Sequence, residues 1–222
     1  MNFISAVEVI GPNMVGPSSS HTAGAVSIGK MARKLFKEKV TEVTFTLYGS
    51  FARTYKGHGT DRALLGGVLG FATDDLRIRD AFSWAEKMGV KYQYIADKEF
   101  VPDHPNTVDI RMTGEKGTKM QVQGQSIGGG KIKITQINGI NVEFTGEYST
   151  LVVKQIDKPG VVTHITQCLS NQNVNIAFMR LFREGKGKTA YSVVESDERI
   201  PDEILEEIRQ NPYVQEILLI QI

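Results

Sequence analysis

Residues 150–169 read Thr-Leu-Val-Val-Lys-Gln-Ile-Asp-Lys-Pro-Gly-Val-Val-Thr-His-Ile-Thr-Gln-Cys-Leu, and they decide the fold of the C-terminal part of the chain. The apolar and β-branched residues of 150–156 predict a strand, and Asp157-Lys-Pro-Gly160 is typical of a tight turn. After the turn, apolar residues recur at helical spacing over 161–169. The stretch therefore predicts a strand that leads through a turn into an amphipathic helix.

The remaining C-terminal sequence continues this alternation. Strand patterns cover 174–182 and 189–195, with a glycine-containing turn between them. A helix is expected over 201–210, because proline occupies its first turn, and a last strand over 213–220. The order βαββαβ is that of the ferredoxin-like unit.

The preceding sequence predicts a separate domain of mixed α/β type. Helices are expected over 20–37, 62–71 and 77–88. Strands are expected over 43–47, 91–95, 107–112, 119–122, 131–136 and 141–144. Three glycines weaken the second helix, which indicates that another segment packs closely against its backbone. The fold class is therefore α+β, with a mixed α/β domain over 1–146 followed by a ferredoxin-like domain over 148–222.

Composition excludes several classes of function. The 222 residues include 26 Lys and Arg against 25 Asp and Glu, so the net charge of +1 argues against bulk nucleic-acid binding. No apolar run approaches the length of a membrane span, and the first residues lack a secretory signal pattern. The single cysteine, Cys168, excludes an intramolecular disulfide and is typical of the reducing cytoplasm. One thiol cannot hold an iron–sulfur cluster, so any cluster would come from a partner.

Three of the four histidines lie in contexts that suit a small-molecule site. His21 follows three serines, His58 lies between two glycines, and His104 lies in Pro-Asp-His-Pro-Asn. Imidazole has a pKa near neutrality and suits proton transfer. The serine-rich helix start offers free amides and hydroxyls to a carboxylate, and its candidate ligands are Ser18, Ser19, Ser20 and Thr22.

Structural interpretations remain open for each of these residues. Three serines before a helix are also a common helix cap, and a single loop histidine is often only solvated. Asp61 either caps the helix that follows it or orients a histidine. His164 and Cys168 are interpreted as structural, and the triple glycine at 128–130 is interpreted as a hinge or turn.

The motifs Gly-Pro-Ser-Ser-Ser-His-Thr, Tyr-Gly-Ser-Phe, Gly-His-Gly-Thr-Asp and His-Pro-Asn, in this order, resemble those of bacterial iron–sulfur L-serine dehydratases. The chain is similar over its whole length to the beta subunit of the two-subunit type. The first domain resembles the allosteric substrate-binding fold, also found in some phosphoglycerate dehydrogenases. The second resembles an ACT domain, an amino-acid-sensing module.

The resemblance implies deamination of L-serine to pyruvate and ammonia without pyridoxal phosphate. It implies an alpha subunit whose cysteines bind a four-iron, four-sulfur (4Fe-4S) cluster. The expected groups facing that cluster are His21, His58, His104 and Asn106. The serine substrate would be held by Ser18, Ser19, Ser20, Thr22 and Asp61. The expected ligand loop of the ACT domain comprises Asp157, Gly160 and Asn175.

Which histidine acts as the base stays open, and two other functions compete. One is a purely regulatory subunit that binds serine as an effector while the partner carries all the chemistry. The other is a stand-alone amino-acid-binding ACT protein. Because an open four-stranded sheet leaves its edges uncovered, we expect ACT-mediated self-association in addition to an alpha–beta heterodimer. No nucleic acid or membrane is expected as a partner.

Overall fold

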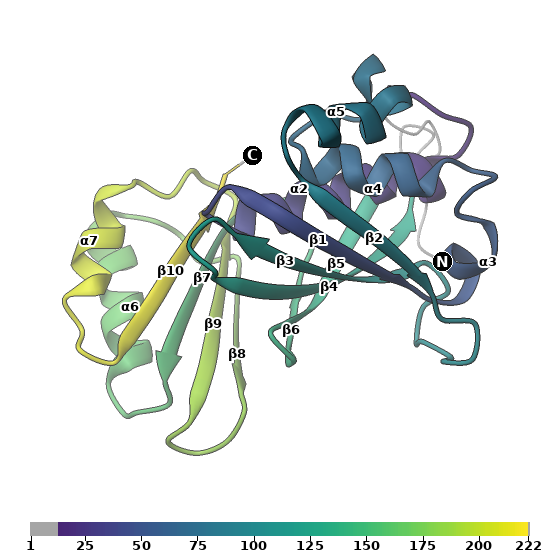
Figure 1. Cartoon of the computed structure of the whole chain (residues 1–222). Helices are drawn as coiled ribbons and strands as arrows, with labels where there is room; N and C mark the ends of the chain where they lie inside the picture. The colour runs from purple at the N-terminus through teal and green to yellow at the C-terminus, as the bar shows by residue number, and fades with distance from the viewer. Residues whose placement is uncertain (1–12, 222) are drawn as a thin grey trace, which may run out of the picture. The chain divides into compact units, whose positions relative to one another are not determined.

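The computed structural model describes residues 13–221 and divides the chain into two compact units, one ending at Asn138 and the other beginning at Gly139 (Figure 1). β6 (Ile140–Phe144) falls with the second unit, although it ends the strand order of the larger sheet. The domain boundary expected near residue 147 therefore stays a prediction. Within the described residues, no helix has the length and apolar character needed to cross a membrane.

The first unit is built on a sheet whose strand order is β2-β1-β3-β4-β5-β6. The strands are β1 (Val40–Leu47), β2 (Lys91–Ala96), β3 (Thr107–Gly114), β4 (Lys119–Gly128) and β5 (Lys131–Ile137). β1 pairs with β2 in parallel and with β3 in antiparallel orientation. The antiparallel register pairs Leu47 with Val108, so the end of β1 lies beside the beginning of β3.

Helices cover one face of this sheet (Figure 1). They are η1 (Ser19–Ala23), a π-helical turn that continues into α2 (Gly24–Leu35), then α4 (Thr60–Val68), the 3₁₀ turn η2 (Leu76–Asp80) and α5 (Ala81–Lys87). α3 (Gly49–Thr54) lies beyond the end of β1 (Figure 1). The Ser18 side chain accepts a hydrogen bond from the His21 backbone and caps the first turn. This confirms the expected helix start at the serine run.

α2 and α4 cross at a backbone contact between glycines. A Cβ added at Gly67 would lie 2.3 Å from the Val26 carbonyl oxygen, and one added at Gly29 would lie 2.4 Å from the Leu64 carbonyl oxygen. Any side chain at either position would therefore force the helices apart. The close packing predicted from the glycines of the second helix is confirmed.

The second unit has the ferredoxin-like order predicted from sequence. Its elements are β7 (Ser149–Ile156), α6 (Val161–Asn171), β8 (Phe178–Arg183), β9 (Thr189–Ser196), α7 (Glu203–Arg209) and β10 (Val214–Ile220). The strands lie in the order β10-β7-β9-β8, and every neighbouring pair is antiparallel. Leu151, Ile165 and Ile204 belong to one buried core between the sheet and its helices.

Several element limits differ from expectation because pairing and packing override local propensity. The strand expected from residue 174 begins only at Phe178, because the ladder with β9 starts at the Phe178–Glu195 pair. α3 was not expected, since residue 49 was interpreted only as the end of a strand. The helix expected over 77–88 is divided into η2 and α5. The triple glycine, which was interpreted as a hinge or a turn, forms the turn between β4 and β5.

Candidate active site

His21 is held by hydroxyl groups at both of its ring nitrogens. Nδ1 lies 3.0 Å from Ser20 Oγ, and Nε2 lies 2.9 Å from Ser50 Oγ. The ring also packs edge-on against Phe51, which is fully buried, with 5.3 Å between the ring centroids. Burial, and secondarily the charge of His58, lower the pKa of His21 below its ordinary value of 6.5. His21 is therefore a fixed, neutral imidazole near neutral pH.

His58 stacks beside His21 but is held less tightly. The two ring centroids are 4.9 Å apart and the rings are tilted by 37°. Nδ1 of His58 lies 3.4 Å from the Thr54 carbonyl oxygen, which can only accept a hydrogen bond, so this contact forms in the tautomer that carries the ring proton on Nδ1. Among the described residues no hydrogen bond reaches Nε2, so in that neutral tautomer Nε2 has a free lone pair.

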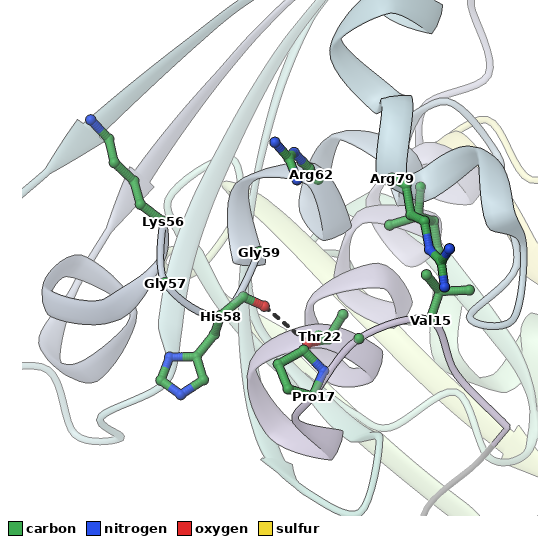
Figure 2. Close-up of a pocket in the computed structure, with 11 residues that line it drawn as sticks. Val15, Pro17, Thr22, Lys56, Gly57, His58, Gly59, Arg62 and Arg79 are labelled. Atoms are coloured by element: carbon green, nitrogen blue, oxygen red, sulfur yellow. Dashed lines mark hydrogen bonds between the residues drawn. The ribbon is translucent and has the colours of Figure 1, made fainter.

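The loop that carries His58 has two faces. Thr22 Oγ1 donates a hydrogen bond of 3.1 Å to the His58 carbonyl oxygen, and Figure 2 shows the imidazole projecting from the opposite side of the loop. Gly59 makes this possible, because it adopts a left-handed conformation (φ 68°) that brings the chain directly into α4.

Ser50, to which sequence reasoning gave no role, connects His21 to the segment containing His104. Its Oγ contacts His21 Nε2, and its backbone N–H donates to the Pro105 carbonyl oxygen at 2.7 Å. The neighbouring Gly49 has a φ of 53°, and a Cβ there would lie 2.6 Å from the same oxygen. The Tyr-Gly-Ser-Phe motif was the available sequence signal for this contact.

His104 and Asn106 form a tight turn before β3. His104 Nδ1 accepts the Asn106 backbone N–H at 3.2 Å, and the Asn106 amide donates to the Ser126 carbonyl oxygen at 3.4 Å. Burial, followed by the charge of Lys133, lowers the pKa of His104. Asn106 Oδ1 and Ser126 Oγ are buried and have no hydrogen-bond partner among residues 13–221. An unpaired buried polar atom costs about 1–3 kcal/mol.

The serines predicted to hold a carboxylate are in part engaged with His21. Ser18 accepts from the His21 backbone and Ser20 contacts its ring. No described hydrogen bond involves the Ser19 side chain, and Thr22 donates to the His58 carbonyl oxygen. Positioning of His21 is thus a function of this run that sequence reasoning missed.

A cavity of about 290 Å³ lies on the Thr22 side of the His58 loop (Figure 2). Three cationic residues, Lys56, Arg62 and Arg79, are among the described residues that line it, and none of those described residues is Asp or Glu. The Lys56 side chain extends away from Thr22 (Figure 2). Val15, Pro17 and Ile78 add apolar surface. Such a lining favours a small ligand that carries a negative charge.

Asp61 does not cap its helix, because the N-cap position belongs to Gly59 and Asp61 lies within the first turn of α4. Its carboxylate accepts the Arg62 backbone N–H at 2.8 Å, and Tyr94 donates to its carbonyl oxygen at 2.6 Å. Burial raises the pKa of Asp61. Within residues 13–221, no hydrogen bond joins it to a histidine.

The expected ACT ligand residues lie in two separate places. Asp157 accepts a hydrogen bond from Arg183 at 3.3 Å, and Gly160 (φ 87°) precedes α6. Asn175 was expected on a strand, but it lies in the connection before β8, where its backbone donates to Glu198. It lines an open hollow to which neither Asp157 nor Gly160 contributes.

This chain does not offer the residues that an iron–sulfur cluster requires. In the described part of the chain, no group of three or more His, Cys, Asp and Glu residues could hold a metal ion. Cys168 is buried in the core of the second unit, and burial, with a smaller contribution from Glu207, raises the pKa of its thiol.

Comparison with known proteins identifies both units. The serine dehydratase beta chain family matches residues 10–93, and the ACT domain family matches residues 149–212. A probable L-serine dehydratase beta chain of Bacillus subtilis (strain 168) is 42% identical over 96% of both chains. The chain belongs to the L-serine dehydratase beta chain family.

Other relatives agree with this assignment. The L-serine dehydratase beta chain of Peptoniphilus asaccharolyticus is 47% identical over 79% of both chains. A D-3-phosphoglycerate dehydrogenase of Bacillus subtilis (strain 168) is 26% identical over 89% of this chain and 37% of the dehydrogenase. The resemblance found in the sequence motifs is thus confirmed. The segment matched by the serine dehydratase beta chain family contains His21, Ser50 and His58, and His104 lies beyond it.

Proposed function

We propose that this serine dehydratase beta chain completes the active site of an iron–sulfur L-serine ammonia-lyase, which converts L-serine to pyruvate and ammonia. The 4Fe-4S cluster would be bound by the cysteines of a separate alpha subunit. The observation that carries the proposal is the His21–His58 pair, with ring centroids 4.9 Å apart and one imidazole nitrogen left as a free acceptor.

The residues of this chain would accept the α proton and bind the substrate. Loss of the α proton and the β hydroxyl of serine leaves an enamine, which water converts to pyruvate and ammonia. Nε2 of His58 is the group best placed to accept the proton, because both nitrogens of His21 are engaged. Asn106, whose amide donates to the Ser126 carbonyl oxygen, remains a proposed member of the site. When bound, the cluster would supply Lewis-acid chemistry at the serine hydroxyl.

Ser19, Ser20, Thr22 and Asp61 remain proposed substrate ligands together with Ser18. The helix start supports this role, because its amides and dipole favour a carboxylate. His104 is the third proposed imidazole of the site. The ACT residues Asp157, Gly160 and Asn175 are proposed to bind an amino-acid effector.

The proposed assembly is an alpha–beta heterodimer in the cytoplasm. A single cysteine in the whole chain supports both a reducing compartment and a partner that supplies the cluster thiolates. ACT-mediated pairing is supported by β10 and β8, the two edge strands of the four-stranded sheet, and by the exposed side chains of Phe178 and Leu181 on β8.

Reconstitution with the cysteine-bearing alpha chain under anaerobic conditions tests the active-site role. His58→Ala and His104→Ala are each expected to lower kcat by about 10²- to 10⁴-fold with cluster absorbance unchanged. His164→Ala, in the second unit, is the matched control and should retain activity. Full activity of both variants, or isolation of the native chain without any cluster-bearing partner, would contradict the proposal.

The cationic cavity favours a second candidate function, in which the chain binds serine only as an effector. Arg79→Gln would then change the half-saturating serine concentration or its cooperativity and leave the maximal rate unchanged. His58→Ala would likewise spare the maximal rate. The two variants together therefore separate a regulatory subunit from a catalytic one.

A further inference from the structure

Ser50 occupies the point where the elements of the candidate site meet. Its hydroxyl contacts His21 Nε2 at 2.9 Å, across 29 positions of sequence, and its backbone N–H binds the Pro105 carbonyl oxygen between His104 and Asn106. The antiparallel pairing of β1 with β3 creates this meeting, because Leu47 pairs with Val108. The segments that follow β1 and precede β3 are thereby placed side by side.

The Ser50 hydroxyl has no role in capping its own helix. The N-cap of α3 is Tyr48, which makes no side-chain cap hydrogen bond, and Ser50 lies one residue inside the helix. The described hydrogen bond of its Oγ goes to His21. Loss of this hydroxyl would therefore release the His21 imidazole without removing a hydrogen bond from α3.

The ring of His21 depends on two hydroxyls for its direction. Ser20 is its sequence neighbour and moves with the same turn, whereas Ser50 belongs to α3 and is fixed to a different element. Without Ser50 Oγ, the imidazole could rotate about its side-chain bonds and lose its stacking on His58. Displacements of about 1 Å among positioned groups can lower a rate by about 100-fold.

We propose that Ser50 is a positioning residue, which fixes the His21 imidazole beside His58 and ties it to the His104–Asn106 turn. The inference rests on the proposed function for its effect on catalysis, but its structural part stands without it. Ser50 does not exchange a proton with substrate in this scheme. Its hydroxyl contacts His21, and its backbone N–H binds the carbonyl oxygen of Pro105, which lies between His104 and Asn106.

Histidine side-chain NMR of the full chain tests the structural part. The sequence has only four histidines, and His21→Gln assigns the His21 signals. Ser50→Ala should shift the Nε2 resonance of His21 and the midpoint of its pH titration, whereas the signals of His164 stay in place. Ser50→Thr, which keeps the hydroxyl, should restore them. His21 signals in Ser50→Ala that superimpose on the wild type would overturn the proposal.

Steady-state kinetics of the reconstituted complex test whether this positioning of His21 affects catalysis. Ser50→Ala should lower kcat about 10- to 100-fold with a smaller change in KM, and Ser50→Thr should recover most of the rate. If Ser50→Ala fails to fold, Ser50→Cys replaces it in both measurements. Its side chain has a shape similar to that of serine, but the thiol forms only weak hydrogen bonds. Shifted His21 signals together with unchanged rates in Ser50→Ala and His58→Ala would support the positioning role and reject the proposed function.

Discussion

The three imidazoles of the first unit differ in what their nitrogens contact. His21 is enclosed by hydroxyls, His58 has an acceptor nitrogen without a described partner, and His104 accepts a backbone amide. Their residue type gave the sequence signal, but this difference depends on side chains from other elements. The sequence therefore identified all three histidines as candidates but did not show which of them acts as the base.

Acidification should destabilise the first unit through the partly buried imidazole of His21. The folded pKa of His21 lies below 6.5, so as pH falls through 6.5 the unfolded chain takes up the proton first. The free energy of unfolding is therefore expected to fall with pH below 6.5 and to be insensitive to this group above it. Urea unfolding of wild type and His21→Gln between pH 5 and 8 measures the effect.

The difference between these two proteins isolates the contribution of His21 from that of other titrating groups. His21→Gln should have the shallower dependence on pH below 6.5, and the two slopes should agree at pH 8. Equal slopes throughout the range would show that the imidazole is not desolvated in the folded chain.

At the scale of elements, the crossing of α2 and α4 positions the site, because η1 begins α2 and the His58 loop leads into α4. The backbones approach so closely at Gly29 and Gly67 that no Cβ fits. Local propensity alone disfavours glycine in a helix by about 1 kcal/mol relative to alanine. At Gly67 glycine is nevertheless preferred to alanine, because the neighbouring helix α2 leaves no room for a Cβ.

Gly67→Ala is accordingly expected to destabilise the chain by about 1–3 kcal/mol, as overpacking does, instead of stabilising the helix. The added methyl group would meet the Val26 carbonyl oxygen at 2.3 Å. Gly57→Ala is the matched control, because its Cβ would lie 3.6 Å from the nearest atom and no positive φ is involved. Chemical denaturation compares the two, and an equal or higher stability of Gly67→Ala would contradict the helix crossing.

At the scale of the whole molecule, the chain consists of two units that each bury a core of their own. Leu169 on α6 is fully buried in the core of the second unit. Leu169→Ala removes this packing and is expected to cost about 2–5 kcal/mol. Amide hydrogen exchange should show faster exchange over 149–220, with α2 and α4 retaining their protection.

Thr166→Ala provides the comparison for that experiment, because its side chain makes only local hydrogen bonds within α6. It should leave the exchange pattern close to that of the wild type. Equal loss of protection in α2 and α4 of Leu169→Ala would indicate that the two units unfold as one.

The order βαββαβ of the second unit, the helix that begins at the serine run and the candidate histidines could all be predicted from the sequence. These depend on apolar periodicity, turn residues and capping, which act between residues close in the chain. The contacts of His21 with Ser50 and His58, and of Ser50 with Pro105, could be found only in the folded chain. Those contacts depend on the β1–β3 register and on the crossing of α2 with α4, and both are fixed by packing between segments distant in sequence.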